Sequence, residues 1–250
     1  PAGTVLDFYC FEALLDSEPQ HMYGNRAAFR YVCREGLQRY VSELRRGYRY
    51  LSVTVRNAYR PVSFTKFETL FSAYPADERG SFACSDPLLE SIWHVGRHTL
   101  RCCMEDTFTD CPGYEQTYWV GDGRNEALVC LAAFGEWEYV RRCAELPAHS
   151  LYRSPVPESQ VPSGWQNILP AWSLLWVQMV EEYYRHSGDR AFLESIYPAV
   201  ERSLESFRTH LAENTGLLSI KAWNLFDWAR TDTNHELVTH NSLFLIEAFE

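Results

Sequence analysis

"CSDPLLESIWHVGRHTLRCCME", residues 84–105, is the stretch in which the hydrophobic pattern changes from that of strands to that of a helix. Several pairs of apolar side chains there are three or four residues apart, which is the spacing of one face of an α-helix. These side chains are Leu88, Leu89, Ile92, Trp93, Val95 and Leu100. Ser85 can cap such a helix and Pro87 suits its first turn, so we expect a helix at about 86–104.

The chain before this stretch has the pattern of β-strands. Five segments there are rich in Val, Tyr and Phe, often alternate between apolar and polar residues, and are separated by turn residues. They are TVLDFYCF (4–11), AFRYVCRE (28–35), QRYVSEL (38–44), YRYLSVTVRN (48–57) and VSFTKFETLFSAY (62–74). We expect the end of an antiparallel β domain, with a boundary near residues 76–84 that separates residues 1–78 from residues 79–250.

The chain after this stretch is expected to be helical, with long loops. Helices should lie at about 123–146 with a break near Gly135, and then at 169–187, 190–212 and 235–250. The loops at 105–122, 147–168 and 213–234 carry most of the unusual residues, and loops this long in a helical domain are more often functional than accidental. The sequence stops at LFLIEAFE in the middle of an amphipathic pattern, so we expect a piece of a longer protein.

The composition narrows the class of partner. The 250 residues are 46% hydrophobic, which is enough to bury a core, and they carry a formal net charge of -10. This charge argues against a nucleic-acid partner, which needs clustered Lys and Arg, and no apolar run is long enough to span a membrane. Aromatic residues make up 15% of the chain, which suits either a sugar-binding cleft or a well-filled core.

The cysteines and histidines give no sign of a metal site. Eight cysteines without a CxxC pair, and histidines without ligand spacing, predict mostly free thiols, no metal and no cofactor. Free thiols favour a reducing, cytoplasmic setting over secretion, although a removed signal peptide leaves the compartment open. Association into homo-oligomers is also left open.

DCPGYEQTYWVGD, residues 110–122, gathers the three carboxylates of Asp110, Glu115 and Asp122. Their spacing does not place them on one helical face, and Pro112 and Gly121 prevent a continuous helix, so they must converge by loop folding. Converging acids could bind a hard cation, hold sugar hydroxyls or supply a general acid, but a calcium loop would need closer alternation of oxygen ligands. Aromatic neighbours favour carbohydrate, because rings pack on the C–H face of a pyranose. These neighbours are Tyr114, Tyr118 and Trp119.

Glu115 is the candidate general acid. Glycoside hydrolysis needs a carboxylic acid that remains protonated near neutral pH. A neighbouring Asp and apolar aromatic walls would raise the pKa of such a group, and Glu115 lies between Tyr114 and Trp119 in the sequence.

The same stretch resembles the D-C-P-x-x-E-x-x-x-W/Y-x-G-D signature of the α-L-rhamnosidases of glycoside hydrolase family 78. The catalytic domain of that family is an (α/α)6 barrel preceded by β-sandwich domains. Further likeness covers roughly residues 45–250, with GYRYLSVTVRNAYRPV (47–62) similar to the last sandwich strands and LPAWSLLWVQMVEEYYRHSGDRAFLESIYPAV (169–200) similar to later barrel helices. The resemblance implies a mainly α chain with an N-terminal β region: the C-terminal portion of a β-sandwich, followed by the first half of an (α/α)6 barrel.

The resemblance also implies roles for individual residues. Carried over by position, Glu115 would protonate the departing glycosidic oxygen, Asp110 and Asp122 would bind rhamnose hydroxyls, and Trp119 would form a wall of the sugar pocket. Trp172, or alternatively Trp176, and the pair Asp227 and Trp228 lie where the family places further pocket residues.

The family inverts the anomeric centre with a second carboxylate in an E-x-W-like segment, and this sequence has no such segment after residue 122. We therefore expect the general base beyond Glu250. Gly113 and Tyr114 stand where many members have a basic residue, so two alternatives remain. One is a six-hairpin glycosidase that acts on a different glycoside, and the other is a non-catalytic carbohydrate-binding protein.

Overall fold

The computed structural model describes residues 1–20, 27–228 and 235–250 and divides into two compact units. The first unit consists of Pro1–Ala73 together with Cys111–Gln116, and the second consists of Tyr74–Asp110 together with Thr117–Glu250. The chain is mainly helical with a small N-terminal sheet, as the sequence predicts.

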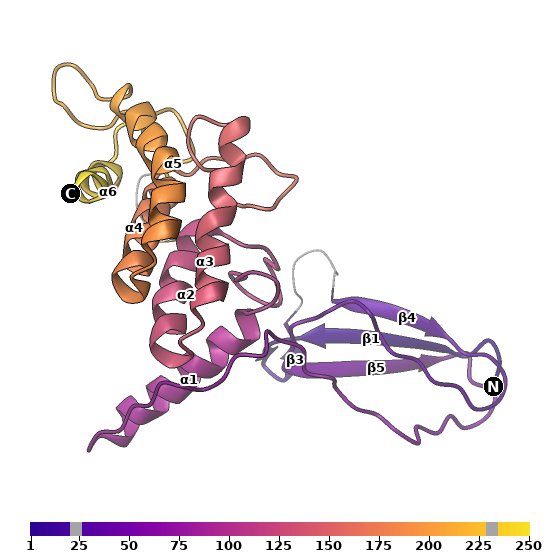
Figure 1. The fold of residues 1–250 in the computed structure, drawn as a ribbon. Coiled ribbons are helices and arrows are strands. Elements are labelled where there is room, and N and C mark those ends of the chain that lie inside the picture. Colours follow the sequence, from indigo (N-terminus) through magenta and orange to yellow (C-terminus); the bar gives the residue numbers. More distant parts are fainter. Residues whose placement is uncertain (21–26, 229–234) are drawn as a thin grey trace. The chain divides into compact units, whose positions relative to one another are not determined.

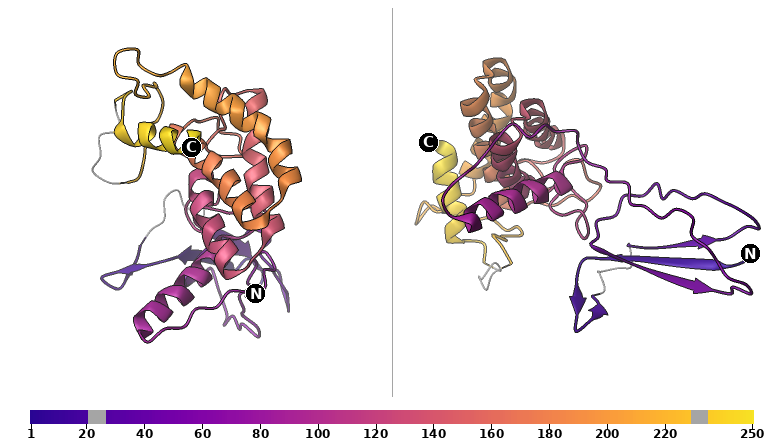
Figure 2. Two further views of the ribbon diagram at one scale, coloured as in Figure 1. Left: turned by 60° about the vertical axis from the view of Figure 1, so that its left-hand side comes forward. Right: turned by 90° about the horizontal axis from the view of Figure 1, so that it is seen from below.

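The first unit contains a three-stranded antiparallel sheet (Figure 1). Its central strand β1, Val5–Phe11, pairs with β4, Ala28–Val32, on one side and with β5, Tyr50–Arg56, on the other. Figure 2 shows the same sheet from two further directions. A two-residue ladder joins β2, Leu14–Leu15, to β3, Glu18–Pro19.

The two faces of β1 differ in chemistry because side chains alternate along a strand. Leu6 and Phe8 are buried on one face, where the Phe8 ring stacks on Phe29 with centroids 4.6 Å apart. Asp7 lies on the other face and accepts hydrogen bonds from Arg30 and Arg56. The hydrogen bond from Arg30, followed by that from Arg56, lowers the pKa of Asp7 to about 2.

Two of the five predicted strand segments are not strands. Residues 38–44 and 62–74 have no regular structure, although both carry the alternating pattern. Phe64, Phe67 and Leu70 are exposed, and no described strand pairs with their segment. A strand needs a neighbour for its backbone hydrogen bonds, which the pattern of one segment cannot supply.

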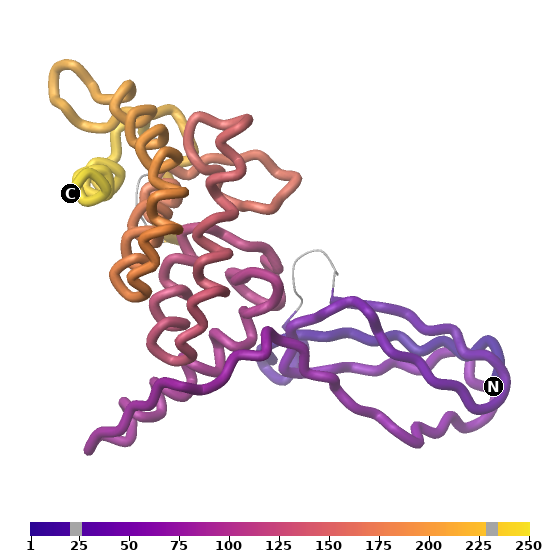
Figure 3. Tube along the Cα trace, in the orientation of Figure 1, coloured from indigo at the N-terminus to yellow at the C-terminus, as the bar shows by residue number. Residues whose placement is uncertain are grey.

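The second unit contains the helices that the sequence predicts, with shifted ends, and a 3-10 helix at the start of the segment 147–168 that was predicted to be a loop. They are α1 Pro87–Cys103, α2 Val120–Ala133, α3 Trp137–Glu145, the 3-10 helix η2 Leu146–Tyr152, α4 Pro170–Ser187, α5 Arg190–Arg208 and α6 Thr239–Phe249. The predicted break near Gly135 is confirmed, because Gly135 has a φ of 66° between α2 and α3. Figure 3 traces the long connection from η2 to α4.

Three helix starts differ from the prediction, and that of α6 is at Thr239 instead of residue 235. The N-cap of α1 is Asp86 rather than Ser85, because Pro87 occupies the first helical position and the Asp86 side chain accepts from the Leu88 amide at 2.9 Å. Helix α2 begins at Val120, earlier than the predicted residue 123, so Asp122 lies in its first turn and not in a loop.

Helix α4 is the centre of the second unit. It contacts α2, α3, α5 and α6, and most of its side chains are buried. Trp176 is completely buried and donates from Nε1 to the Ala144 carbonyl oxygen at 2.7 Å. Among the described residues, no helix is both long enough and apolar enough to cross a membrane.

Replacing Gly80 by Ala should destabilise the second unit. The Gly80 amide donates to the Ala133 carbonyl at 2.9 Å, and an added Cβ would lie 2.0 Å from the Ala132 carbonyl oxygen. The backbone can relieve this overlap only by giving up the hydrogen bond, so we expect a loss of about 1–3 kcal/mol in the free energy of unfolding, measured with denaturant.

Gly96→Ala is the matched control for this substitution. Gly96 lies inside α1, and its Cβ would meet no described atom within 4 Å outside the backbone of that helix. Ala is favoured over Gly in a helix interior by about 1 kcal/mol, so this variant should be slightly more stable. Equal stability of Gly80→Ala and the unchanged protein would contradict the close approach.

Candidate active site

The start of α2 is fixed by the buried ring of Tyr118. The ring packs on Gly123, where an added Cβ would lie 2.2 Å from a ring carbon. Its hydroxyl donates to the Cys143 carbonyl oxygen of α3 at 2.8 Å. Trp119 and Asp122 come shortly after Tyr118 in the chain. The contacts of Tyr118 therefore fix the positions of their side chains.

Asp110 lies at the end of a tightly bonded turn after α1. The amide and the hydroxyl of Thr109 donate to the Cys103 carbonyl at 2.8 and 3.1 Å. The Asp110 amide donates to the Thr117 carbonyl at 3.1 Å. This hydrogen bond joins the two residues that flank the segment 111–116. The Asp110 backbone is therefore held on both sides.

Glu115 lies in residues 111–116, which belong to the first compact unit, whereas the other predicted site residues belong to the second. Its side chain is exposed. Its amide donates to Cys111 Sγ at 3.2 Å, and the Gln116 amide donates to the Cys111 carbonyl at 3.0 Å. These bonds close a compact turn with Glu115 on its surface.

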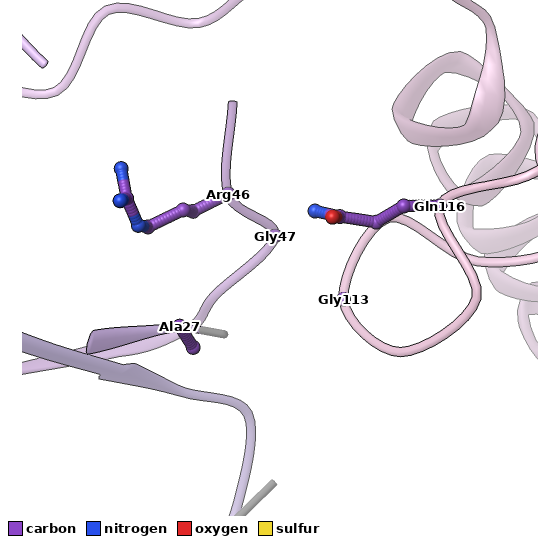
Figure 4. Close-up of a pocket in the computed structure, with 5 residues that line it drawn as sticks. All are labelled: Ala27, Arg46, Gly47, Gly113 and Gln116. Atoms are coloured by element: carbon purple, nitrogen blue, oxygen red, sulfur yellow. The ribbon is translucent and has the colours of Figure 1, made fainter. Parts of the chain in front are cut away.

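A glycine contact holds this turn within the first unit. The Gly47 amide donates to the Pro112 carbonyl at 3.1 Å, and an added Cβ on Gly47 would lie 2.6 Å from the Pro112 carbonyl carbon. Gln116 points toward the Gly47 segment across a small hollow (Figure 4), and its Nε2 donates to the Pro112 carbonyl at 2.9 Å.

Asp122 and Trp172 are brought together. Trp172, in the first turn of α4, donates from Nε1 to Asp122 Oδ2 at 3.0 Å. The indole lies against Gly121, where any Cβ would be 2.7 Å from the ring. Of the two tryptophans that the resemblance left open, Trp172 contacts a predicted site residue, whereas Trp176 is buried in the core.

Asp122 lies at a favourable end of its helix. It is in the first turn of α2, where the helix dipole stabilises negative charge. Two residues later, Arg124 Nε donates to Glu182 Oε2 of α4 at 2.9 Å. The Trp172 hydrogen bond to Asp122 and this ion pair two residues later join α2 to α4.

Four tryptophans form a continuous cluster beside the start of α2. Trp119 contacts Trp165 and Trp223 edge to face, with centroids 5.9 and 6.2 Å apart, and Trp223 contacts Trp228 at 6.4 Å. Trp119 is 8% exposed, whereas Trp165 is 54% exposed and Trp228 is 85% exposed. Asp227 is exposed next to Trp228, and its Oδ1 accepts from the Trp228 amide.

Trp165 and Trp223 were missed by the sequence analysis. Both lie in the long loops that were predicted to be functional, but neither belongs to the motif or to the segments that carry the family resemblance most clearly. The clustering of Trp in those loops is the signal that could have found them.

Glu126 is a third residue that the sequence analysis missed. It follows Asp122 by one helical turn, and its Oε2 is buried without a hydrogen-bond partner among the described residues. Burial, followed by the charges of Asp122 and Asp110, raises the pKa of Glu126 from 4.5 to about 9. Glu126 is therefore a neutral carboxylic acid near neutral pH, at a position that the sequence analysis did not single out.

The carboxylates and tryptophans around the start of α2 are of the kinds that bind a polyhydroxylated ligand. Carboxylates accept hydrogen bonds from sugar hydroxyls, and indole rings pack on sugar C–H faces. In the described regions of the chain, no group of three or more His, Cys, Asp or Glu side chains is arranged to hold a metal ion.

The starts of α2 and α4 bring a carboxylate and a tryptophan together, a combination typical of helical domains that bind carbohydrate. Comparison with known families gives the same class. Residues 77–249 match the family described as the bacterial alpha-L-rhamnosidase 6 hairpin glycosidase domain, and the chain belongs to this family.

Solved structures and a curated protein agree with this assignment. A GH78 family rhamnosidase of Bacillus sp. GL1 is 48% identical with a TM-score of 0.95, over 99% of this chain and 26% of that one. A rhamnosidase from Klebsiella oxytoca with rhamnose bound is 24% identical with a TM-score of 0.73, over 100% of this chain and 53% of that one. An alpha-L-rhamnosidase of Formosa agariphila is 21% identical over 86% of this chain and 25% of its own length. The chain thus spans between a quarter and about half of these relatives.

Replacing Trp172 by Phe should weaken the junction of α2 and α4. The variant keeps an aromatic ring but removes the Nε1 donor to Asp122. Hydrogen bonds to charged groups contribute about 1.5–3 kcal/mol, so we expect a loss of this order in the free energy of unfolding. Trp137→Phe, at a position 37% exposed, is the control and should change stability much less. Equal losses in the two variants would contradict a special contribution of the Asp122 contact.

Proposed function

We propose that this chain belongs to a glycoside hydrolase that removes terminal α-L-rhamnosyl residues with inversion at the anomeric carbon. The observation that carries the proposal is the pairing of Asp122 with Trp172 in a chain of this family, beside a cluster of four tryptophans. The rhamnose bound to the Klebsiella oxytoca relative supports the choice of sugar.

In this proposal Glu115 is the general acid. It donates its proton to the glycosidic oxygen while the bond from that oxygen to the anomeric carbon breaks. Glu115 is exposed on a compact turn that is closed by hydrogen bonds to Cys111. Asp110 and Asp122 accept hydrogen bonds from the sugar hydroxyls.

The tryptophans form the walls of the sugar pocket in this proposal. Trp119 and Trp172 border the sugar, and Asp227 with Trp228 completes the pocket. Trp165 and Trp223 join these residues through their ring contacts with Trp119. The exposed rings of this cluster offer apolar faces on which a deoxysugar, with its methyl group, can pack.

Inversion requires a second carboxylate. It removes a proton from the water that attacks the anomeric carbon from the face opposite the leaving group, at about 6.5–9.5 Å from the general acid. We propose that this base lies outside the 250 residues, within the remaining length that the relatives have and this chain does not span.

The proposed architecture follows from the same family membership. Residues 1–78 are the end of a β-sandwich and a linker, and residues 79–250 are the N-terminal portion of an (α/α)6 barrel. The antiparallel sheet around β1 and the successive helices α1 to α6 support this division.

Glu115→Gln in the complete protein should remove nearly all hydrolysis of a phenyl α-L-rhamnoside. A general acid contributes about a hundredfold to ten-thousandfold, and the amide has no acidic proton to donate. Hydrolysis of a dinitrophenyl rhamnoside should fall much less, because this leaving group needs little protonation. Comparing kcat on the two substrates measures the effect, with Glu213→Gln, an exposed acid in another loop, as the control.

Asp122→Asn should weaken sugar binding more than it changes the fold. The amide can still accept from Trp172, but it loses the charge that strengthens hydrogen bonds from hydroxyls. A loss of about 1.5–3 kcal/mol corresponds to a dissociation constant for L-rhamnose raised roughly 10- to 150-fold, measured by calorimetry. Unchanged affinity for L-rhamnose would remove Asp122 from the sugar site.

A panel of other aryl glycosides tests the sugar itself. Faster turnover of a different glycoside would replace rhamnose in the proposal. Sugar binding without any product from the complete protein would indicate a carbohydrate-binding protein instead of an enzyme.

A further inference from the structure

Glu126 lies directly behind the two aspartates that are proposed to bind the sugar. It is on α2, four residues after Asp122, so the two side chains lie on the same side of the helix one turn apart. Its Oε2 is buried, and no hydrogen-bond partner for this oxygen is found among residues 1–20, 27–228 and 235–250. A carboxylate in such a place would be costly, because a buried charge needs a partner.

Among the residues that the structure describes, no positive charge is found to lower the pKa of Glu126. Arg124, on the same helix, is engaged with Glu182 of α4. The titratable groups that interact with Glu126 come from α2, α3 and the segments around residues 110 and 118, and all of them are neutral or negative. Asp122 and Asp110 raise the pKa of Glu126, and the charge of Glu126 in turn raises the pKa values of Tyr118, Cys130, Tyr139 and Cys143.

We propose that Glu126 is a positioning residue that acts as an uncharged carboxylic acid and keeps a third negative charge away from Asp110 and Asp122. Its acid form fills the space beneath Asp122 without repelling it, so both aspartates remain ionised and can accept sugar hydroxyls. Ionised Glu126 would repel both carboxylates and disturb the start of α2, from which Trp119 and Asp122 emerge. The inference rests on the proposed sugar-binding role of the two aspartates.

The pKa of Glu126 sets the pH above which its uncharged form is lost. The pKa of Glu126 is about 9, so the group is a neutral acid at neutral pH and ionises in alkaline solution. Because its pKa in the folded protein lies above the unfolded value of 4.5, its contribution to stability is complete below about pH 4.5. That contribution decreases as the pH rises and is lost at about pH 9.

The main experiment is the pH dependence of KM for an aryl α-L-rhamnoside in the complete protein and in Glu126→Gln. At neutral pH the two should agree within about threefold, because Gln resembles the neutral acid in size and charge. Above about pH 9, KM of the unchanged protein should rise roughly tenfold per pH unit, as expected for one ionisation, whereas KM of Glu126→Gln should not share this rise. Glu138→Gln, which removes an exposed carboxyl of α3, should keep the rise.

A second measurement needs no substrate and separates the two proposals. The melting temperature of the unchanged protein should fall more steeply with rising pH, from about 4.5 to 9, than that of Glu126→Gln. If no glycoside is turned over but this difference is seen, the proposed function fails and the uncharged state of Glu126 stands.

Two results would overturn the inference. One is the same alkaline rise of KM in Glu126→Gln as in the unchanged protein. The other is a large loss of folding or affinity in Glu126→Gln at neutral pH, because such a loss would mean that Glu126 acts there as a carboxylate.

Discussion

The buried hydroxyl of Tyr118 is the contact on which the geometry of the second unit depends. It donates to the Cys143 carbonyl of α3 while its ring lies on Gly123 of α2. A buried hydroxyl that loses its partner costs about 1–3 kcal/mol, so the position of Tyr118 is strongly determined. Trp119, Asp122 and Glu126 are the residues that follow, and their directions are set by where this helix begins. The Trp172 hydrogen bond to Asp122 then fixes α4 to the same point.

Much of the second unit follows from its sequence. The helical spacing of apolar residues predicted the helices to within a few positions. Helices α2, α3, α5 and α6 all contact α4, whereas Leu88, Ile92 and Val95 of α1 are exposed. The break at Gly135 was visible as a glycine, and a glycine is suited to a positive φ. The helix starts were less predictable, because the N-cap depends on which side chain accepts a hydrogen bond from an amide of the first turn. Pro87 moved the cap of α1 to Asp86, and Tyr118 brought the start of α2 forward to Val120.

The first unit was harder to predict. Residues 38–44 and 62–74 have the composition of strands but do not pair with any described strand. Strand formation depends on a neighbour that is distant in the sequence, whereas a helix makes its hydrogen bonds within itself. The same difference explains the missed site residues. Trp165 and Trp223 meet Trp119 only through tertiary contacts, and no local pattern links the three.

The acids of the motif region differ in environment more than their sequence suggests. Asp122 has the favourable field of a helix start and a tryptophan donor, whereas Glu126, one turn deeper, has neither. One turn of helix, a rise of about 5.4 Å, therefore separates a carboxyl with a tryptophan donor from one whose pKa is raised to about 9. The deeper group cannot ionise cheaply while Asp110 and Asp122 are charged, because like charges at short range in a poorly solvated interior repel strongly. The ionisation of the outer acids and the neutrality of the inner acid are therefore one coupled property. A substitution that neutralises Asp122 should lower the pKa of Glu126, so the two positions cannot be interpreted as independent.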